Sequence, residues 1–184
     1  VLFARVDSVY KTIPGLDVYD IERDARTYSG PFPVVAHPPC RAWGKLRKMA
    51  KPRDDEKQLA IFAVEQIRKN GGVLEHPAYS TLWPAAGLPR PGAGRDSYGG
   101  FSIDINQSWF GHKAQKRTWL YICGIDPMDV PPISLSFNAI THTVCQDPRK
   151  VKKELSKKAR EATPIKLAQW MVSVCETIQK NHKS

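Results

Sequence analysis

The stretch Phe32-Pro-Val-Val-Ala-His-Pro-Pro-Cys40 is an apolar run that ends in two prolines and a cysteine. Each proline ring fixes its own φ and restricts the residue before it, so the backbone ahead of the cysteine is stiff. The run therefore predicts a buried strand over residues 32–36, followed by a rigid turn that presents the Cys40 thiol. Because a positive neighbour lowers a thiol's pKa, Arg41 and His37 are expected to make this cysteine nucleophilic.

Apolar strands and amphipathic helices alternate along the chain. Residues 54–69 predict a helix, with acids in its first turn, Arg68 and Lys69 in its last turn and two glycines after it. A second helix is expected to start at Thr163-Pro164. Strands are expected over residues 1–4, 17–21, 32–36, from 73 onward, 102–105 and 119–123, and a loop covering the site over 84–100. This order predicts an α/β fold, Rossmann-like, with a mostly parallel sheet flanked by helices.

Length and charge narrow the class of protein. The 184 residues suit one domain, residues 1–184, and no apolar run is long enough to cross a membrane, so no membrane partner is expected. Four scattered cysteines do not form a disulfide framework, which favours a cytoplasmic location. The net charge of +10 predicts a polyanionic partner, with DNA favoured. Two basic stretches, residues 41–53 and 149–160, carry much of this charge.

Two further motifs lie at the edges of expected strands. Val73-Leu-Glu75-His76-Pro77 is a short apolar strand that ends in a carboxylate. Phe110-Gly-His-Lys-Ala-Gln-Lys-Arg-Thr118 is a basic cluster that leads directly into the strand expected at 119–123. A thiol, an acid and a cationic cluster therefore follow one another along the chain, each at a strand edge.

This order of motifs resembles the cytosine-C5 DNA methyltransferase family, a family of transferases. It resembles in particular the small bacteriophage-borne methyltransferase-like proteins that lack a target-recognition domain. The resemblance implies a minimal class I methyltransferase-like fold, with Cys40 as nucleophile, Glu75 as acid and Arg117 as cationic support. The cofactor residues that it implies are Phe3, Asp7, Ser8, Glu22 and Thr163. The substrate-binding residues that it implies are His37, Pro39, Arg41, His76, His112, Lys113 and Lys116.

The chemistry that the resemblance implies begins with attack of the Cys40 thiolate on C6 of a pyrimidine, which makes C5 nucleophilic. Glu75, with a pKa raised by its place in a cleft, is expected to protonate or hydrogen-bond N3 and the exocyclic amine. Arg117 is expected to hold the O2 edge or a phosphate. S-adenosylmethionine is the implied donor, but Leu2–Ser8 lacks the glycines that the family has there, so another donor stays open. No metal is expected.

Residues 126–158 form a basic connector where the family has a target-recognition domain. The substrate is then a weakly selected DNA, a single strand or a free pyrimidine nucleotide, or else a protein partner supplies recognition. One alternative is a catalytically inactive nucleic-acid-binding phage protein, a regulator or antidefence factor, in the bacterial host cytoplasm. Another is a zinc protein, because His37-x-x-Cys40 and His142-x-x-Cys145 have chelating spacing.

Overall fold

The computed structural model describes residues 1–136, 138–145 and 151–182. A four-stranded sheet lies at its centre in the order β1 (Val34–Ala36), β2 (Gly72–Pro77), β4 (Arg117–Cys123) and β3 (Phe101–Asn106). β1 and β2 are parallel, whereas β4 is antiparallel to both β2 and β3. The expected α/β class is present, but the sheet is mixed rather than mostly parallel. The short connection between β3 and β4 cannot cross the sheet, so these two strands must pair antiparallel.

Two N-terminal segments extend this sheet beyond β1 without forming regular strands. Leu2 bridges Ala36 in parallel, and Tyr19 bonds the backbone of Val1 and Ala4, with N···O distances of 2.9 Å for both. Between these contacts Phe3 has a φ of 60°, which interrupts the pleat and shifts the pairing. The strands expected at 1–4 and 17–21 therefore exist only as irregular extended segments.

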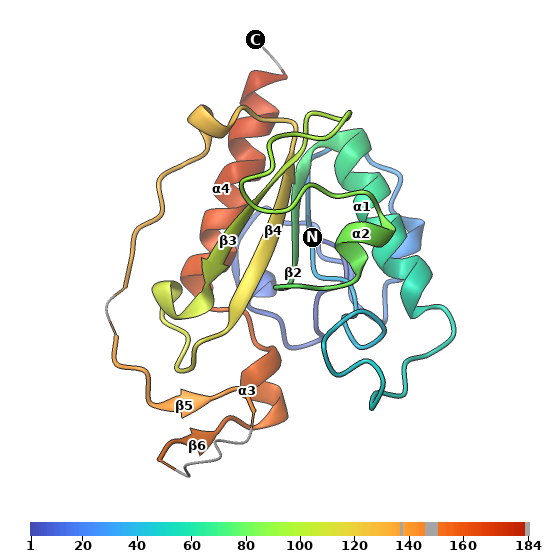
Figure 1. Cartoon of the computed structure of the whole chain (residues 1–184). Helices are drawn as coiled ribbons and strands as arrows, with labels where there is room; N and C mark the ends of the chain where they lie inside the picture. Colours follow the sequence, from blue (N-terminus) through green and yellow to red (C-terminus); the bar gives the residue numbers. More distant parts are fainter. Residues whose placement is uncertain (137, 146–150, 183–184) are drawn as a thin grey trace.

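Helices cover both faces of the sheet, as Figure 1 shows. α1 (Glu56–Asn70) and the short α2 (Leu82–Ala85) lie on one face, and α4 (Ile165–Asn181) lies on the other. The helix expected at 54–69 is thus present as α1. The final helix begins at Ile165 with Pro164 as its N-cap, so Thr163 does not cap it as expected.

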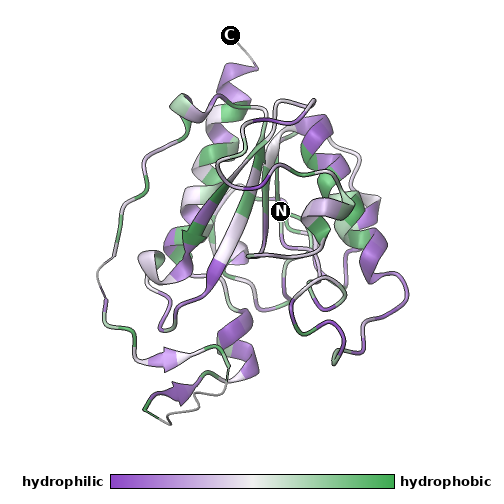
Figure 2. Ribbon diagram, in the orientation of Figure 1, coloured by the Kyte–Doolittle hydropathy of each residue, from purple (hydrophilic) through white to green (hydrophobic). Residues whose placement is uncertain are grey.

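Side-chain alternation along the strands divides the core into two clusters. Leu74, Trp119 and Tyr121 pack with α1, while Leu120 and Ile122 belong to the cluster that contains the buried face of α4. In Figure 2 the hydrophobic colours gather on the strands and on the helix faces turned towards them. This alternation also decides which strand residues can meet in a site.

A small C-terminal region lies at one end of the molecule in Figure 1. It consists of β5 (His142–Thr143), β6 (Lys153–Glu154), which pair in parallel, and α3 (Lys157–Glu161). A bridge between Ala114 and His142 attaches it to the loop before β4. Part of the basic connector expected at 126–158 forms this region, and Arg149 and Lys150 lie outside the described residues.

Several connections between the strands and helices contain a single short 3-10 turn. They are η1 (Val9–Thr12), η2 (Ala25–Thr27), η3 (Gln107–Phe110) and η4 (Pro127–Asp129).

The segment 84–100, expected as a loop covering the site, is held near the start of β2, away from the residues that follow β1. Asp96 in this segment bonds Arg68 at 3.0 Å and Tyr121 at 2.8 Å. Among the described residues, no helix has the length and apolarity needed to cross a bilayer.

The close approach of β1 and β2 gives the first prediction. Gly72 has a φ of 135°, and a Cβ there would overlap the carbonyl of Val34. We expect Gly72→Ala to lower the free energy of unfolding by at least about 3 kcal/mol. Gly87→Ala is the control, because Gly87 also has a positive φ of 61° but open space around it. Its expected loss in urea denaturation is about 1 kcal/mol. Equal losses would show that the β1–β2 approach is not as tight as described.

Candidate functional site

The candidate site lies at the carboxyl ends of the parallel segments. The chain runs from residues 1–4 outward to 17–21 and then returns to β1 on the other side, so the strand order reverses between the first segment and β1. In open α/β sheets, ligands bind beside the carboxyl ends of strands at such a reversal. Cys40 follows β1, and Glu75 lies near the end of β2. The fold therefore brings the expected nucleophile and acid to one edge of the sheet.

A chain of hydrogen bonds holds Glu75 in place. His37 Nδ1 lies 3.1 Å from Glu75 Oε2, and its Nε2 lies 2.8 Å from the Tyr10 hydroxyl. On the other side, Gln107 Nε2 donates to Glu75 Oε1 at 2.9 Å and to the Thr118 hydroxyl at 3.1 Å. A His37 ring that donates from Nδ1 to Glu75 and accepts at Nε2 from Tyr10 uses both of its nitrogens in this chain. His37 was expected to bind substrate, but both of its ring nitrogens bind protein groups.

The Glu75 carboxyl is ionised at neutral pH. Burial raises its pKa, but the hydrogen bond from His37 and the charge of Lys116 outweigh burial and bring the pKa to about 2. The expectation of a raised pKa was therefore wrong. The physical reason is that burial here comes with donors aimed at the charged form of the carboxyl. Glu75 is thus equipped to accept hydrogen bonds and not to donate a proton.

The surroundings of Cys40 do not activate its thiol at rest. The residue reaches the surface, yet removal of the thiol from water and the Glu75 carboxylate raise the pKa of Cys40, and Lys116 lowers it only in part. Arg41, expected to lower this pKa and to bind substrate, instead pairs with the buried carboxylate of Glu56 at the start of α1. The cation that acts on Cys40 is therefore Lys116.

The expected role of Arg117 is not supported by its position. Its guanidinium bonds Asp104 at 2.7 and 2.9 Å and lies over the ring of Tyr79, on the α1 side of the sheet. Glu75 lies on the opposite face, because it pairs with Leu120, whose side chain belongs to the α4 cluster. Neighbouring residues of a strand point to opposite faces, so Lys116, and not Arg117, shares the face of Glu75.

His76 is a core residue. It is fully buried on the α1 face, its ring 6.4 Å from that of Trp83, and burial lowers its pKa to about 4. Neither ring nitrogen makes a hydrogen bond of normal geometry, and the carbonyl of Pro39 and the carboxylate of Glu75 are the polar groups that act on it. The expectation that His76 binds substrate was wrong, while Pro39 remains half-buried beside Cys40.

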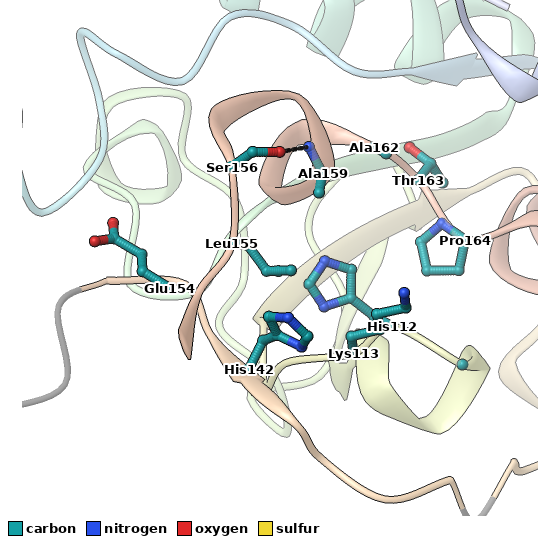
Figure 3. A pocket seen from close by; sticks show the side chains of 11 residues that line it. His112, Lys113, His142, Glu154, Leu155, Ser156, Ala159, Ala162, Thr163 and Pro164 are labelled. Atoms are coloured by element: carbon teal, nitrogen blue, oxygen red, sulfur yellow. Dashed lines mark hydrogen bonds between the residues drawn. The ribbon is translucent and has the colours of Figure 1, made fainter. Parts of the chain in front are cut away.

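A cavity of about 420 Å³ lies between the loop before β4 and the C-terminal region. In Figure 3 the rings of His112 and His142 lie in it, and Thr163 lines it beside Pro164. His112 is buried, bonds the Ala114 carbonyl at 2.7 Å through Nδ1, and has a pKa lowered by burial. Lys113 also lines the cavity. Cys40, Glu75 and Lys116 do not line it, so His112, Lys113 and Thr163 belong to a separate hollow.

Three of the residues expected to hold a cofactor, Phe3, Asp7 and Ser8, are engaged with the protein. Asp7 pairs with Arg5 and with Lys158 of α3, both at 2.9 Å, and these cations hold its pKa well below the usual range. The Ser8 hydroxyl caps η1. Glu22 is exposed at a turn.

Phe3 packs edge-on against Phe62 of α1. A nucleoside-containing cofactor needs polar groups that are still available. Of the acidic and hydroxyl residues near the loop, Glu22 keeps an exposed carboxylate, whereas Asp7 and Ser8 are used by protein contacts, so the set fits S-adenosylmethionine only in part. The donor therefore stays open.

Comparison of the chain with protein-family models, with curated proteins and with solved structures gave no match. Within the described part of the chain, no group of three or more histidine, cysteine or acidic residues has an arrangement suited to a metal ion. His37 uses both ring nitrogens in the chain of hydrogen bonds, so it lacks a free nitrogen for zinc. Gln107 was not among the expected site residues, and Tyr10 was considered only as a ligand for a phosphate or another donor; both instead hold the site together through His37 and Glu75.

The burial of His76 predicts a loss of stability in acid. Its pKa of about 4 lies below the ordinary value of 6.5, so the unfolded chain binds more protons between these values. The free energy of unfolding should therefore fall as pH drops from 6.5 to 4, by roughly 3 kcal/mol. In urea denaturation, His76→Phe should remove much of this fall. His182→Phe, at an exposed position, should not. An unchanged fall in His76→Phe would exclude a neutral buried His76.

The charges around Cys40 predict opposite effects of two substitutions. Glu75→Gln removes the carboxylate that raises the pKa of Cys40, so alkylation of Cys40 by iodoacetamide should reach its midpoint at a lower pH. Lys116→Met removes the cation that lowers this pKa, so the midpoint should move up. Mass spectrometry of the Cys40 peptide reports the rate, and the exposed Cys145 is the internal control. Shifts in the same direction would show that these charges do not act on the thiol.

Proposed function

We propose that this chain modifies C5 of cytosine, in nucleic acid or a nucleotide, through a covalent adduct between Cys40 and C6. The observation that supports this proposal most directly is the meeting of Cys40 with the ionised Glu75 at the carboxyl ends of β1 and β2. Lys116 acts on both groups. A thiol next to a buried hydrogen-bond acceptor suits cytosine, which would be attacked at C6 and held through a hydrogen bond donated by its exocyclic amine.

In the proposed reaction the Cys40 thiol loses its proton to solvent, and the thiolate adds to C6. The C5–C6 double bond supplies the electron pair that makes C5 nucleophilic. Glu75 accepts a hydrogen bond from the exocyclic amine, the edge by which cytosine differs from uracil and thymine. Lys116 offsets the negative charge that develops on the ring. His37 and Gln107 keep the Glu75 carboxylate in one orientation.

We also assign the fold to a minimal Rossmann-like, class I methyltransferase-like form. The reversal of strand order beside β1 and the helices on both faces support this assignment. The single 3-10 turns η1 and η2, in place of full helices, account for the small size. The enzyme class that follows is a DNA (cytosine-5)-methyltransferase-like transferase, acting in a cytoplasm, that of a bacterial host if the chain is phage-encoded. A protein partner that supplies sequence recognition remains part of the proposal.

A second candidate is a nucleic-acid-binding protein on the same fold that has lost catalysis. The raised pKa of Cys40 and the ion pairs that occupy the cofactor loop favour it. The net charge of +10 supports both candidates equally. Release of the C5 hydrogen distinguishes them, because only the enzyme forms the C6 adduct.

The experiment is release of tritium from C5-labelled cytosine in single-stranded DNA, duplex DNA, RNA and dCMP. The thiolate adds at C6 and solvent protonates C5; elimination then removes a triton from C5 and the thiolate from C6, which restores the double bond and releases the label without any donor. We expect release by the wild type, loss of at least 100-fold in Cys40→Ala, and a rate that rises towards alkaline pH because the Cys40 pKa is raised.

Glu75→Gln should also lose rate, since an amide cannot replace the carboxylate as a charged acceptor. Addition of S-adenosylmethionine then tests whether methyl is the group transferred. No release from any of the four substrates would overturn the enzyme proposal and favour the binding protein.

A further inference from the structure

Tyr79 stands at the surface immediately after β2. It lies in the turn that follows Pro77, and 49% of the residue is exposed. Its φ of 63° is unusual for a residue with a side chain and places the aromatic ring in a strained backbone position. The ring packs at 4.9 Å from that of Trp119, which supports it from below the surface.

Two cations flank this ring. Lys45 Nζ lies 4.9 Å from the ring centroid, and the Arg117 guanidinium carbon lies 5.0 Å from it. They come from different segments, the loop after Cys40 and the start of β4. Cations over an aromatic ring hold its orientation. Arg117 is also paired with Asp104, whereas Lys45 is exposed at the surface.

The turn that carries Tyr79 is bonded to the turn that carries Cys40. Thr81 donates from its backbone N and its hydroxyl to the carbonyl of Trp43, both at 3.0 Å. Trp43 in turn donates to the carbonyl of Cys40 at 3.1 Å, and Ala78 donates to that of Arg117 at 3.1 Å. The turn that carries Tyr79 is therefore linked through Trp43 to the turn that carries Cys40.

The loop beyond Cys40 adds charge to the same surface. Residues 41–53 hold six Lys and Arg residues and no acid. Arg47, Lys48, Lys51 and Arg53 are exposed, as are the apolar Leu46 and Met49. The charge of this surface complements a polyanion. The exposed apolar side chains favour nucleic acid over other polyanions, because only nucleic acid also offers the flat apolar faces of bases.

We propose that Tyr79 and the loop 41–53 form a platform for single-stranded nucleic acid, on which an unpaired base beside the target base stacks. An exposed aromatic ring can stack only on a base that is not already stacked in a duplex. In a single strand any of the bases can stack in this way. The cations of the loop contact the phosphates of the same strand. This proposal rests on the proposed function, which identifies the target base as cytosine. It adds that the substrate of the Cys40 site is single-stranded nucleic acid.

The test measures binding of a fluorescein-labelled 12-nucleotide oligodeoxycytidylate by anisotropy, beside the same strand in a duplex. Tyr79→Ala should weaken single-strand binding by tenfold or more, whereas Tyr79→Phe should stay within about twofold. Tyr98→Ala is the matched control, because Tyr98 is 58% exposed and has Arg68 at 4.3 Å over its ring, yet lies in the loop held at the other end of the sheet. It should bind as the wild type does.

Salt dependence separates stacking from charge. Tyr79→Ala should leave the slope of log affinity against log salt unchanged, while Lys48→Ala should reduce it by about 0.7. Equal losses in Tyr79→Ala and Tyr98→Ala, tighter binding of the duplex, or no binding by the wild type would each overturn the proposal. Thermal unfolding of Tyr79→Ala and Tyr79→Phe shows whether a loss of binding reflects the ring or the fold.

Tritium release separates this proposal from the proposed function. Tyr79→Ala should lose release from single-stranded DNA at low substrate concentration but keep release from dCMP, which has no neighbouring base. Single-strand binding that depends on Tyr79 without any release would leave the platform standing and overturn the enzyme. Release that depends on Cys40 but is unaffected by Tyr79 would overturn the platform alone.

Discussion

The buried carboxylate of Glu75 links several segments of this molecule that lie far apart in the sequence. Through His37 and Tyr10 it connects β2 to the turn after β1 and to η1, and through Gln107 it connects to η3 and the start of β4. A buried charge is costly unless donors surround it, and loss of one donor leaves the charge uncompensated. The interaction that orients the candidate site is therefore also the one that fixes the segments around it.

Strand alternation explains which parts of the site the sequence could predict. The placement of Cys40 and Glu75 at strand ends followed from the apolar runs before them, and α1 from its charged ends and the glycines after it. The choice between Lys116 and Arg117 depended on which face of β4 meets Glu75. The sequence shows that Lys116 falls on the same face of β4 as Leu120 and Ile122. Only the β2–β4 register shows that Glu75 lies on that face too.

Other features were beyond the sequence because they depend on contacts between distant segments. Arg41 stands beside Cys40 in the chain, yet the buried Glu56, fifteen residues on, takes its guanidinium. Proximity in sequence therefore gave the wrong cation. Gln107 carries no motif, and only the approach of η3 to β2 reveals its contact with Glu75. The position of β4 in the sheet has the same origin, since the short β3–β4 connection indicates their antiparallel pairing but the pairing of β4 with β2 leaves no local mark.

The electrostatics of the resting site bear directly on how the proposed reaction would begin. Burial and the Glu75 carboxylate raise the pKa of Cys40 and outweigh the opposing charge of Lys116, so the thiol is protonated in the resting site. A cytosine amine that donates to Glu75 would offset part of that negative charge, and Lys116 would then act on the thiol with less opposition. Binding of the correct base would thereby favour the thiolate, whereas uracil or thymine, which present an acceptor at that edge, would not. On this argument Glu75 selects the base and controls the nucleophile through the same charge.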